Sequence, residues 1–270
     1  MTIELGILGA GNMAEAIARG VIASGLLAPE QVLASDVSPQ RREWFQGQLG
    51  IRAIDDNRAV AREARTLLLS VKPQHMPEAL AGLGEVMDAQ ALVISIAAGI
   101  STLFIEGRLG GNAHWRVLRA MPNTPMLVGE GIVALARGQH ATEEDAAAAR
   151  RLFETAAIVV DVAEEQIDAV TAVSGSGPAY VFYLVEQMIR AATELGLSPE
   201  QARQFAVQTA IGASRMLAES LESPQELRRK VTSPGGTTQA AITYMDQRDC
   251  AATMVQAIKA AAQRSRELGN

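Results

Sequence analysis

Short apolar runs of strand length recur through the first part of the chain, and segments with helical spacing separate several of them. The strand-like runs lie at residues 3–8, 31–36, 66–71, 91–96, 115–120, 131–136 and 157–162. After the first run, Met13, Ile17 and Val21 repeat with the spacing of one helix face, and a second helical pattern covers residues 142–156. Strands that alternate with helices indicate an α/β fold, with an open, doubly wound and mostly parallel sheet covered on both faces.

The pattern changes at Glu164, where strand-like runs stop and helical spacing continues to the C-terminus. We expect helices at about residues 178–195, 199–217, 224–231, 237–246 and 249–267. The helix that begins at Pro178 is apolar around more than half of its circumference, so it is either buried deeply or shared with another subunit. The chain is therefore predicted to hold two domains, residues 1–163 built on the sheet and residues 164–270 built of helices alone.

A glycine-rich turn joins the first strand to the first helix, in the sequence Gly9-Ala10-Gly11-Asn12-Met13-Ala14. In the G-x-G-x-x-A spacing, Gly9 permits a tight turn, Gly11 lets backbone N–H groups approach a pyrophosphate, and Ala14 lets helix and strand pack closely. The N–H groups and dipole of the helix N-terminus favour an anion there. Because the turn lies between the required strand and helix, it predicts dinucleotide binding; an ordinary glycine-rich turn is the alternative.

The end of the second predicted strand leaves the choice of dinucleotide open. Asp36 is placed to accept a hydrogen bond from the 2′-hydroxyl of an adenosine ribose, which favours NAD. A 2′-phosphate, which favours NADP, would instead be surrounded by Ser35, Ser38, Arg41 and Arg42. Both sets also have explanations without a ligand, because Asp36 can cap a turn and the two arginines can lie on a solvated helix face.

Later strand ends carry residues suited to a flat ligand. Val71-Lys72-Pro73 ends one strand, Ala97-Ala98-Gly99 ends the next with small residues, and Met121-Pro122-Asn123 begins a loop that is either a rigid turn or a wall of a nicotinamide pocket. Lys72 is either a catalytic acid or phosphate contact, or a solvated side chain at a strand end. Asn57 precedes a short helical pattern and is expected to be its N-cap.

Composition excludes several functional classes. The 270-residue chain has a net charge of −6 and no Lys/Arg cluster, which argues against nucleic-acid binding. No apolar run approaches transmembrane length, and the first strand leaves no room for a signal peptide, so no membrane partner is expected. The single cysteine, Cys250, suits a cytoplasmic location and is expected to be buried packing rather than a nucleophile. His75, His114 and His140 share no motif, and no metal site is predicted.

A second glycine-rich turn, Ser233-Pro234-Gly235-Gly236-Thr237-Thr238, opens a helix in the second half of the chain. Its N–H groups and the hydroxyls of Thr237 and Thr238 form a cradle for an anion the size of a small carboxylate. Taken alone, the turn is equally well explained as a capped turn. Beside a dinucleotide fold, it indicates the substrate-binding half of a reductase.

Together these motifs closely resemble those of the pyrroline-5-carboxylate reductase family. The resemblance covers essentially the whole chain and rests on residues 9–14, 71–73, 95–99, 120–125, 173–180 and 233–238. It implies the NAD(P)H-dependent reduction of 1-pyrroline-5-carboxylate, a cyclic imine carboxylate, to L-proline, the last step of proline biosynthesis. It also implies a Rossmann domain followed by an all-helical dimerisation domain, with homodimers that often assemble further into decamers.

The site that these arguments predict has a cofactor part and a substrate part. The expected cofactor is NADP(H), with NAD(H) as an alternative or addition. The predicted cofactor-binding residues are Gly9, Ala10, Gly11, Asn12, Met13, Ser35, Asp36, Asn57, Val71, Lys72, Pro73, Ala97, Ala98, Gly99, Met121, Pro122 and Asn123. By the resemblance, the residues that hold the substrate carboxylate are Ser233, Gly236, Thr237 and Thr238.

Thr171 resembles the family hydroxyl near the imine nitrogen and is a candidate proton relay; otherwise it is a helix hydroxyl bonded to its own backbone. An imine nitrogen is basic enough to carry its own proton near neutral pH. Catalysis is therefore expected to be mostly positioning and desolvation.

Two other functions fit parts of the sequence. A β-hydroxyacid dehydrogenase shares the plan of a Rossmann domain followed by helices, but that family carries a catalytic lysine on its first interdomain helix. Residues 174–190 contain no lysine, which argues against this function. A non-catalytic dinucleotide sensor would keep the first glycine turn but has no need for the second one at residues 233–238.

Overall fold

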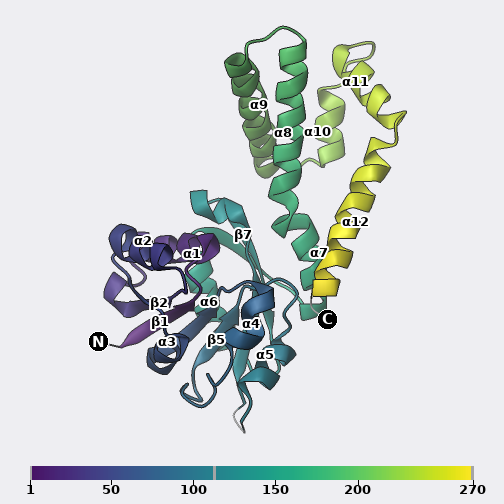
Figure 1. Ribbon diagram of the computed structural model, residues 1–270. Helices are drawn as coiled ribbons and strands as arrows, with labels where there is room; N and C mark the ends of the chain where they lie inside the picture. Colours follow the sequence, from purple (N-terminus) through teal and green to yellow (C-terminus); the bar gives the residue numbers. More distant parts are fainter. Residues whose placement is uncertain (1, 112–113, 269–270) are drawn as a thin grey trace. The chain divides into compact units, whose positions relative to one another are not determined.

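The structure is a computed structural model that describes residues 2–111 and 114–268 (Figure 1). The chain divides into two compact units, of which the first is Met1–Ser176 with Ala261–Asn270 and the second is Gly177–Ala260. In the described part of the chain, no helix combines the length and the apolar character needed to cross a membrane.

An eight-stranded sheet forms the centre of the first unit, with the order β3-β2-β1-β4-β5-β6-β7-β8. The strands are β1 (Ile3–Leu8), β2 (Val32–Ser35), β3 (Arg52–Ile54), β4 (Ala64–Leu69), β5 (Leu92–Ser95), β6 (Arg116–Met121), β7 (Gly131–Arg137) and β8 (Ala157–Asp161). All neighbours pair in parallel except β6 and β7, which are antiparallel. The order reverses between β1 and β4, as in a Rossmann fold, so the predicted α/β class is confirmed.

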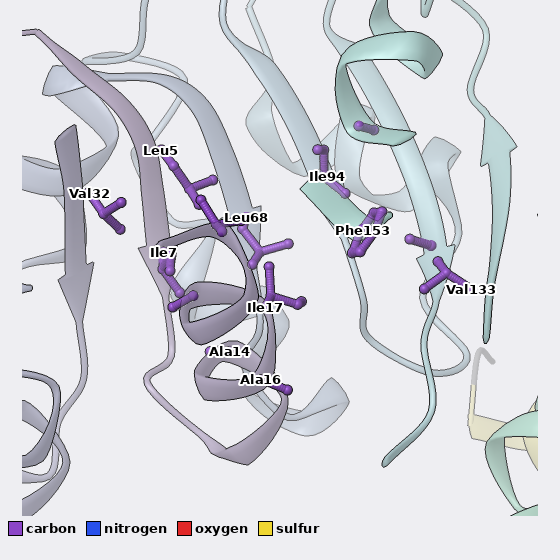
Figure 2. Packing of buried hydrophobic residues seen from close by; sticks show 14 of the residues in the cluster. Leu5, Ile7, Ala14, Ala16, Ile17, Val32, Leu68, Ile94, Val133 and Phe153 are labelled. Atoms are coloured by element: carbon purple, nitrogen blue, oxygen red, sulfur yellow. The ribbon is translucent and has the colours of Figure 1, made fainter. Parts of the chain in front are cut away.

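Helices cover both faces of this sheet. They are α1 (Asn12–Ala23), α2 (Pro39–Leu49), α3 (Asn57–Glu63), α4 (Met76–Ala79), α5 (Thr102–Leu109), α6 (Glu143–Phe153) and α7 (Ile167–Val170). One core cluster joins α1, α2 and α6 to the strands, and Figure 2 shows Ile17 and Phe153 among the strand side chains. A second cluster, which includes Leu8 and Val93, joins α3, α4 and α5 to the sheet. Burial on both faces explains why the strands read as continuous apolar runs.

The second unit is helical, as the sequence predicts. It contains α8 (Gly177–Glu194), α9 (Pro199–Glu219), α10 (Pro224–Lys230), α11 (Thr237–Asp246) and most of α12 (Cys250–Leu268), and α8 packs against α9. The start of α9 follows from its sequence, because the Ser198 hydroxyl accepts a hydrogen bond from the Gln201 N–H and the Gln201 side chain bonds back to the Ser198 N–H.

Very little of the second unit is buried within one chain. Among its described residues only Ala202 and Ala206 are buried. In α8, Phe182 and Tyr183 are 68% and 65% exposed, so of the two alternatives the deeply buried helix is not observed, and the helix shared with another subunit remains. Cys250 is likewise exposed, which contradicts its predicted role as buried packing.

Candidate active site

A cavity of about 530 Å³ opens at the carboxyl ends of β1, β2 and β4, next to the point where the strand order reverses. In open α/β sheets, ligands bind at such a point. The cavity is lined by Gly9, Gly11, Ser35, Asp36, Val37, Asn57, Ser70, Val71, Lys72, His75, Glu78 and Ala79. Seven of the predicted cofactor residues are thus brought together. The other five lining residues were not predicted as site residues, although Val37 and Ser70 each adjoin a predicted one and the rest lie soon after the predicted Val71-Lys72-Pro73 turn; they are Val37, Ser70, His75, Glu78 and Ala79.

The first glycine turn has the geometry of a cradle. Gly9 has φ +93°, and a Cβ there would lie 2.7 Å from the carbonyl oxygen of Ser70, so only glycine fits. A Cβ at Gly11 would meet no protein atom within 4 Å. Gly11 is also the N-cap of α1 and supplies no side-chain acceptor to the first N–H groups of the helix. These donors therefore suit an anion at the cavity.

Ala10, between the two glycines, is fully buried, and both of its backbone polar groups are bonded to protein. Its N–H donates to Oδ2 of Asp36 at 2.8 Å, and its carbonyl oxygen accepts from Nε of Arg41 at 2.6 Å. Arg41 also pairs with Glu15 at 3.0 Å. The expectation that Arg41 lies on a solvated helix face is therefore wrong, because the side chain fastens α2 to the glycine turn.

Asn57 is positioned by a neighbouring strand. The Ser35 hydroxyl donates to Oδ1 of Asn57 at 2.7 Å, which leaves the Asn57 amide nitrogen as the donor for a ligand in the cavity. The N-cap of α3 is Asp56, whose carboxylate accepts from the N–H groups of Arg58 and Ala59. The predicted cap was thus wrong by one residue, because two consecutive polar residues both fit the cap in sequence.

A second cavity, of about 280 Å³, adjoins the first, and both are lined by Ser70, Val71 and Lys72. Its other lining residues are Met13, Pro73, Ile96, Ala97, Ala98, Met121, Pro122, Asn123, Thr124 and Gly175. Most of its lining side chains are small or apolar, which suits a flat nicotinamide ring. Gly99 is buried at φ +77° and lies outside both lining sets, as do Ala10 and Asn12.

Asn123 does more than line this second cavity. Its Nδ2 donates to the carbonyl oxygen of Ser174 at 3.2 Å, and its Oδ1 accepts from the N–H of Ile132 at 3.0 Å. A Cβ at Gly175 would lie 2.6 Å from Cε of Met121. The loop after β6 is thereby bound closely to the π-helical turn Thr171–Gly175.

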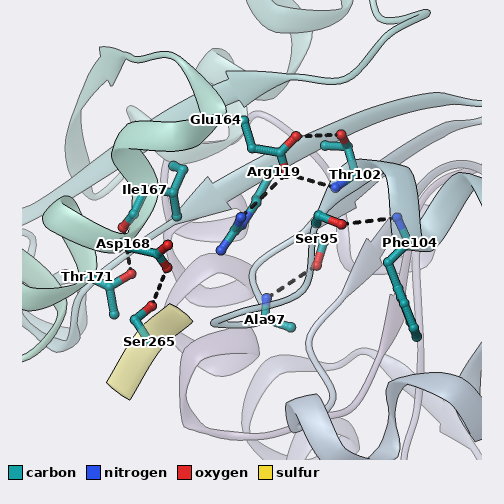
Figure 3. A network of polar contacts seen from close by, with 11 residues as sticks. Ser95, Ala97, Thr102, Phe104, Arg119, Glu164, Ile167, Asp168, Thr171 and Ser265 are labelled. Carbon is teal, nitrogen blue, oxygen red and sulfur yellow. Dashed lines mark hydrogen bonds and ion pairs between the residues drawn. The ribbon is translucent and has the colours of Figure 1, made fainter. Parts of the chain in front are cut away.

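Thr171 begins that π-helical turn. Its hydroxyl donates to the carbonyl oxygen of Ile167 at 2.8 Å (Figure 3), so the alternative of a hydroxyl bonded to its own backbone is the arrangement observed. Because the proton is directed to Ile167, the lone pairs of the Thr171 oxygen are left to accept a hydrogen bond. Its role in catalysis stays a prediction.

A partly buried polar network around α7 was not predicted. Nη1 of Arg119 lies 3.4 Å from Oε1 of Glu164, and Glu164 also accepts from the N–H and hydroxyl of Thr102 at 2.8 and 2.6 Å (Figure 3). Asp168 accepts from the Ser265 hydroxyl at 2.6 Å. The only sequence signal was a charged residue, Arg119, inside a strand-like apolar run. The network fastens the segment that carries Thr171 to β6, α5 and the end of α12.

In the second unit, the other glycine turn has a cavity of its own. A space of about 370 Å³ is lined by Gly235, Gly236, Gln239, Ala240, Thr243, Tyr244 and Gln247. Gly236 is the N-cap of α11, and no side chain caps the helix there. Of the predicted substrate residues, Gly236 lines this space, whereas Ser233, Thr237 and Thr238 do not. Gln239 was not predicted; its side chain accepts from the Gly235 N–H.

Comparison with known proteins gives consistent results. Residues 164–268 match the family described as pyrroline-5-carboxylate reductase dimerisation, and residues 4–99 match the family described as NADP oxidoreductase, coenzyme F420-dependent. The chain is 39% identical over 269 residues to a pyrroline-5-carboxylate reductase of Synechocystis sp., covering 100% of this chain and 99% of the relative.

Solved structures agree with this. The chain is similar to a pyrroline-5-carboxylate reductase of Coxiella burnetii, with a TM-score of 0.88, 35% identity and 100% of both chains covered. It is also similar to a Plasmodium falciparum pyrroline carboxylate reductase solved with NADP bound, with a TM-score of 0.90, 28% identity and 99% and 98% covered. The resemblance inferred from the motifs is confirmed: the chain belongs to the pyrroline-5-carboxylate reductase family.

Proposed function

We propose that this chain reduces 1-pyrroline-5-carboxylate to L-proline with NADPH or NADH, the last step of proline biosynthesis. The observation that carries the proposal is the pair of adjoining cavities at the carboxyl edge of the sheet, in a chain related over its whole length to pyrroline-5-carboxylate reductases. One cavity opens beside the glycine cradle and the other has small, flat walls, as the two ends of a dinucleotide require.

The predicted cofactor residues fall into groups according to the cavity that they line. We assign the pyrophosphate to the cradle at Gly9 and Gly11. A side chain at Gly9 would collide with protein, and a side chain at Gly11 would project into the open space that we assign to the pyrophosphate. The adenosine half belongs with Asp36 and Asn57, and the nicotinamide ring lies against the second cavity. When bound there, the reduced nicotinamide supplies the hydride.

The chemistry needs little acid or base from the protein. The substrate nitrogen carries its own proton, and hydride addition to the C=N carbon converts the protonated imine into the secondary amine of proline. The Thr171 oxygen, whose proton is held by Ile167, accepts a hydrogen bond from the protonated nitrogen and so favours the charged, reactive form. The bound nicotinamide and substrate, together with the apolar residues that line the second cavity, would displace water from the reacting atoms.

The substrate carboxylate is assigned to the second glycine turn. The hydroxyls of Ser233, Thr237 and Thr238, together with N–H groups at the start of α11, are suited to a small anion. Gly236 keeps the approach to these groups open because it carries no side chain.

The helical unit supports a homodimer. Large apolar side chains of α8 and α9 are exposed in the single chain, and burying them against a second copy would give the unit the core that it lacks. We propose that residues 164–270 form this dimerisation domain after the 1–163 dinucleotide domain, that dimers assemble further into decamers, and that the enzyme works in the cytoplasm.

The direct test is to follow the absorbance of NADPH and of NADH with 1-pyrroline-5-carboxylate and to identify proline as the product. Oxidation with stoichiometric formation of proline supports the proposal. If the folded protein binds either cofactor but oxidises neither with this imine, the proposal is wrong and a dinucleotide sensor remains.

A further inference from the structure

We propose that Asp36 makes this enzyme prefer NADH to NADPH, because its fixed carboxylate lies where the 2′-phosphate of NADPH would bind. The inference rests on the proposed function, since it requires that the first cavity receives the adenosine half of a dinucleotide. The sequence alone left this choice open between Asp36 and a group of serines and arginines.

The carboxylate of Asp36 is held on both oxygens. Oδ2 accepts from the N–H of Ala10 at 2.8 Å, and Oδ1 accepts from the N–H of Ser38 at 2.8 Å. Asp36 follows the last residue of β2 and lines the cavity, the position from which an acidic side chain bonds to a ribose 2′-hydroxyl in Rossmann folds. A carboxylate there accepts from the hydroxyl of NADH and repels a phosphate.

Rotating the Asp36 side chain out of its observed position would also be energetically unfavourable. Turning its side chain away from a phosphate would strip the Ala10 N–H of its acceptor, and Ala10 is fully buried. A buried donor without a partner is strongly unfavourable. The same bond holds the glycine turn in place, so the enzyme cannot adapt to NADPH at this point without loosening the pyrophosphate cradle.

The two arginines near Asp36 are already engaged. Arg41 bonds to the Ala10 carbonyl at 2.6 Å, pairs with Glu15 at 3.0 Å and lies 4.9 Å from the ring centroid of Trp44. Nη1 of Arg42 donates to the carbonyl oxygen of Asp36 at 2.7 Å. Each guanidinium therefore gives some of its N–H donors to protein acceptors, and only the remaining donors could bind a 2′-phosphate.

The surrounding charge also disfavours a second phosphate. A side cavity of about 270 Å³ next to Asp36 is lined by three further carboxylates, of Asp55, Asp56 and Glu78, against a single arginine, Arg58. Arg58 is itself paired with Glu85 at 3.1 Å. Asp55 in turn pairs with Arg42 at 3.9 Å. The carboxylates around this space still outnumber the arginines, so a charged phosphate is repelled there and an uncharged hydroxyl is not.

The test compares kcat/KM for NADH and NADPH with 1-pyrroline-5-carboxylate. We expect kcat/KM for NADH to exceed kcat/KM for NADPH by about tenfold or more in the wild type, because two like charges placed together at a binding site strongly weaken binding. Asp36→Ser should shift the ratio toward NADPH by at least about tenfold, because it removes the repulsion of the 2′-phosphate and also the hydrogen bond to the ribose hydroxyl of NADH. Glu43→Gln is the matched control, because it removes one negative charge from an exposed position of α2 that lines neither cavity, and it should leave the ratio within about twofold. Because salt screens the repulsion between Asp36 and the 2′-phosphate, high salt should bring the wild-type ratio closer to one.

Asp36→Asn is the second variant, because it keeps one oxygen to accept from Ala10 if Asp36→Ser unfolds. The same preference can be measured without catalysis by comparing, in calorimetry, the Kd of 5′-AMP, which has a 2′-hydroxyl, with the Kd of 2′,5′-ADP, which has a 2′-phosphate. A wild-type ratio at or below one, or an unchanged ratio in both Asp36 variants, would overturn the inference and leave the reductase function standing. A preference for 5′-AMP in a protein that does not reduce the imine would instead refute the proposed function and support the inference.

Discussion

Replacing Gly11 by alanine is expected to weaken cofactor binding while the protein stays folded. Gly11 has φ −74° and ψ −177°, a conformation that alanine adopts without strain, and its Cβ would meet no protein atom within 4 Å. The methyl group therefore enters the space at the start of α1 to which we assign the pyrophosphate. Gly9→Ala would be a poorer probe, because the Cβ at that position collides with the protein itself.

The size of the effect follows from the hydrogen bonds at stake. Alanine is a weaker N-cap than glycine, so Gly11→Ala should cost about 0.5–1 kcal/mol of stability. Displacing a phosphate from one backbone N–H removes a hydrogen bond to a charged group, which is worth about 1.5–3 kcal/mol. That loss corresponds to an increase in the Kd of NADH and NADPH of roughly 10- to 100-fold.

The assay is a titration of each reduced cofactor into the variant, followed by its nucleotide fluorescence, together with thermal unfolding by circular dichroism. Gly47→Ala is the matched control, because Gly47 lies within α2 and a Cβ there also meets nothing within 4 Å. It should raise stability by up to about 1 kcal/mol through helix propensity and leave both Kd values unchanged. If Gly11→Ala binds both cofactors with wild-type Kd, the assignment of the pyrophosphate to this turn is wrong.

Three further substitutions test the rest of the site. Thr238→Ala should raise the KM for 1-pyrroline-5-carboxylate by roughly 10- to 100-fold through loss of one hydrogen bond to the carboxylate, and equal losses for substrate and cofactor would contradict it. Thr171→Val should lower kcat/KM for the imine by about tenfold, with Thr171→Ser close to wild type and cofactor Kd unchanged in both; a fully active valine variant would remove Thr171 from the mechanism. Asn123→Ala should reduce the free energy of unfolding by about 2–4 kcal/mol in urea titrations, because it leaves the N–H of Ile132 and the carbonyl of Ser174 without their partner. Wild-type stability in that variant would show that the loop after β6 is held by other contacts.

The sequence by itself determined the class of fold and the position of the glycine-rich turn between the first strand and the first helix. Strand and helix periods are local, and a buried parallel strand such as β1 is apolar on both faces wherever it lies in a sheet. The glycine turn is local as well, because the positive φ of Gly9 restricts that position to glycine. The short strand β3 was missed, since its three residues include the exposed Arg52 and give no apolar run.

Only the tertiary structure decided what each polar residue does. Asp36 and Ala10 are 26 residues apart in the chain, and Asn123 and Ser174 are 51 apart, so no local spacing reveals that these pairs are hydrogen-bonded. The same holds for Arg41, which the sequence placed either at a phosphate or in solvent and which instead holds the glycine turn.

The sequence likewise could not show which apolar side chains are exposed in the single chain. An apolar helix has the same sequence pattern whether its own chain or a second copy covers it, and the structure shows that its own chain buries no residue of α8. Hydrogen-bond partners and burial depend on distances between segments far apart in sequence. Sequence periodicity therefore identifies the elements and the motif, whereas the packing of those elements assigns each side chain its partner.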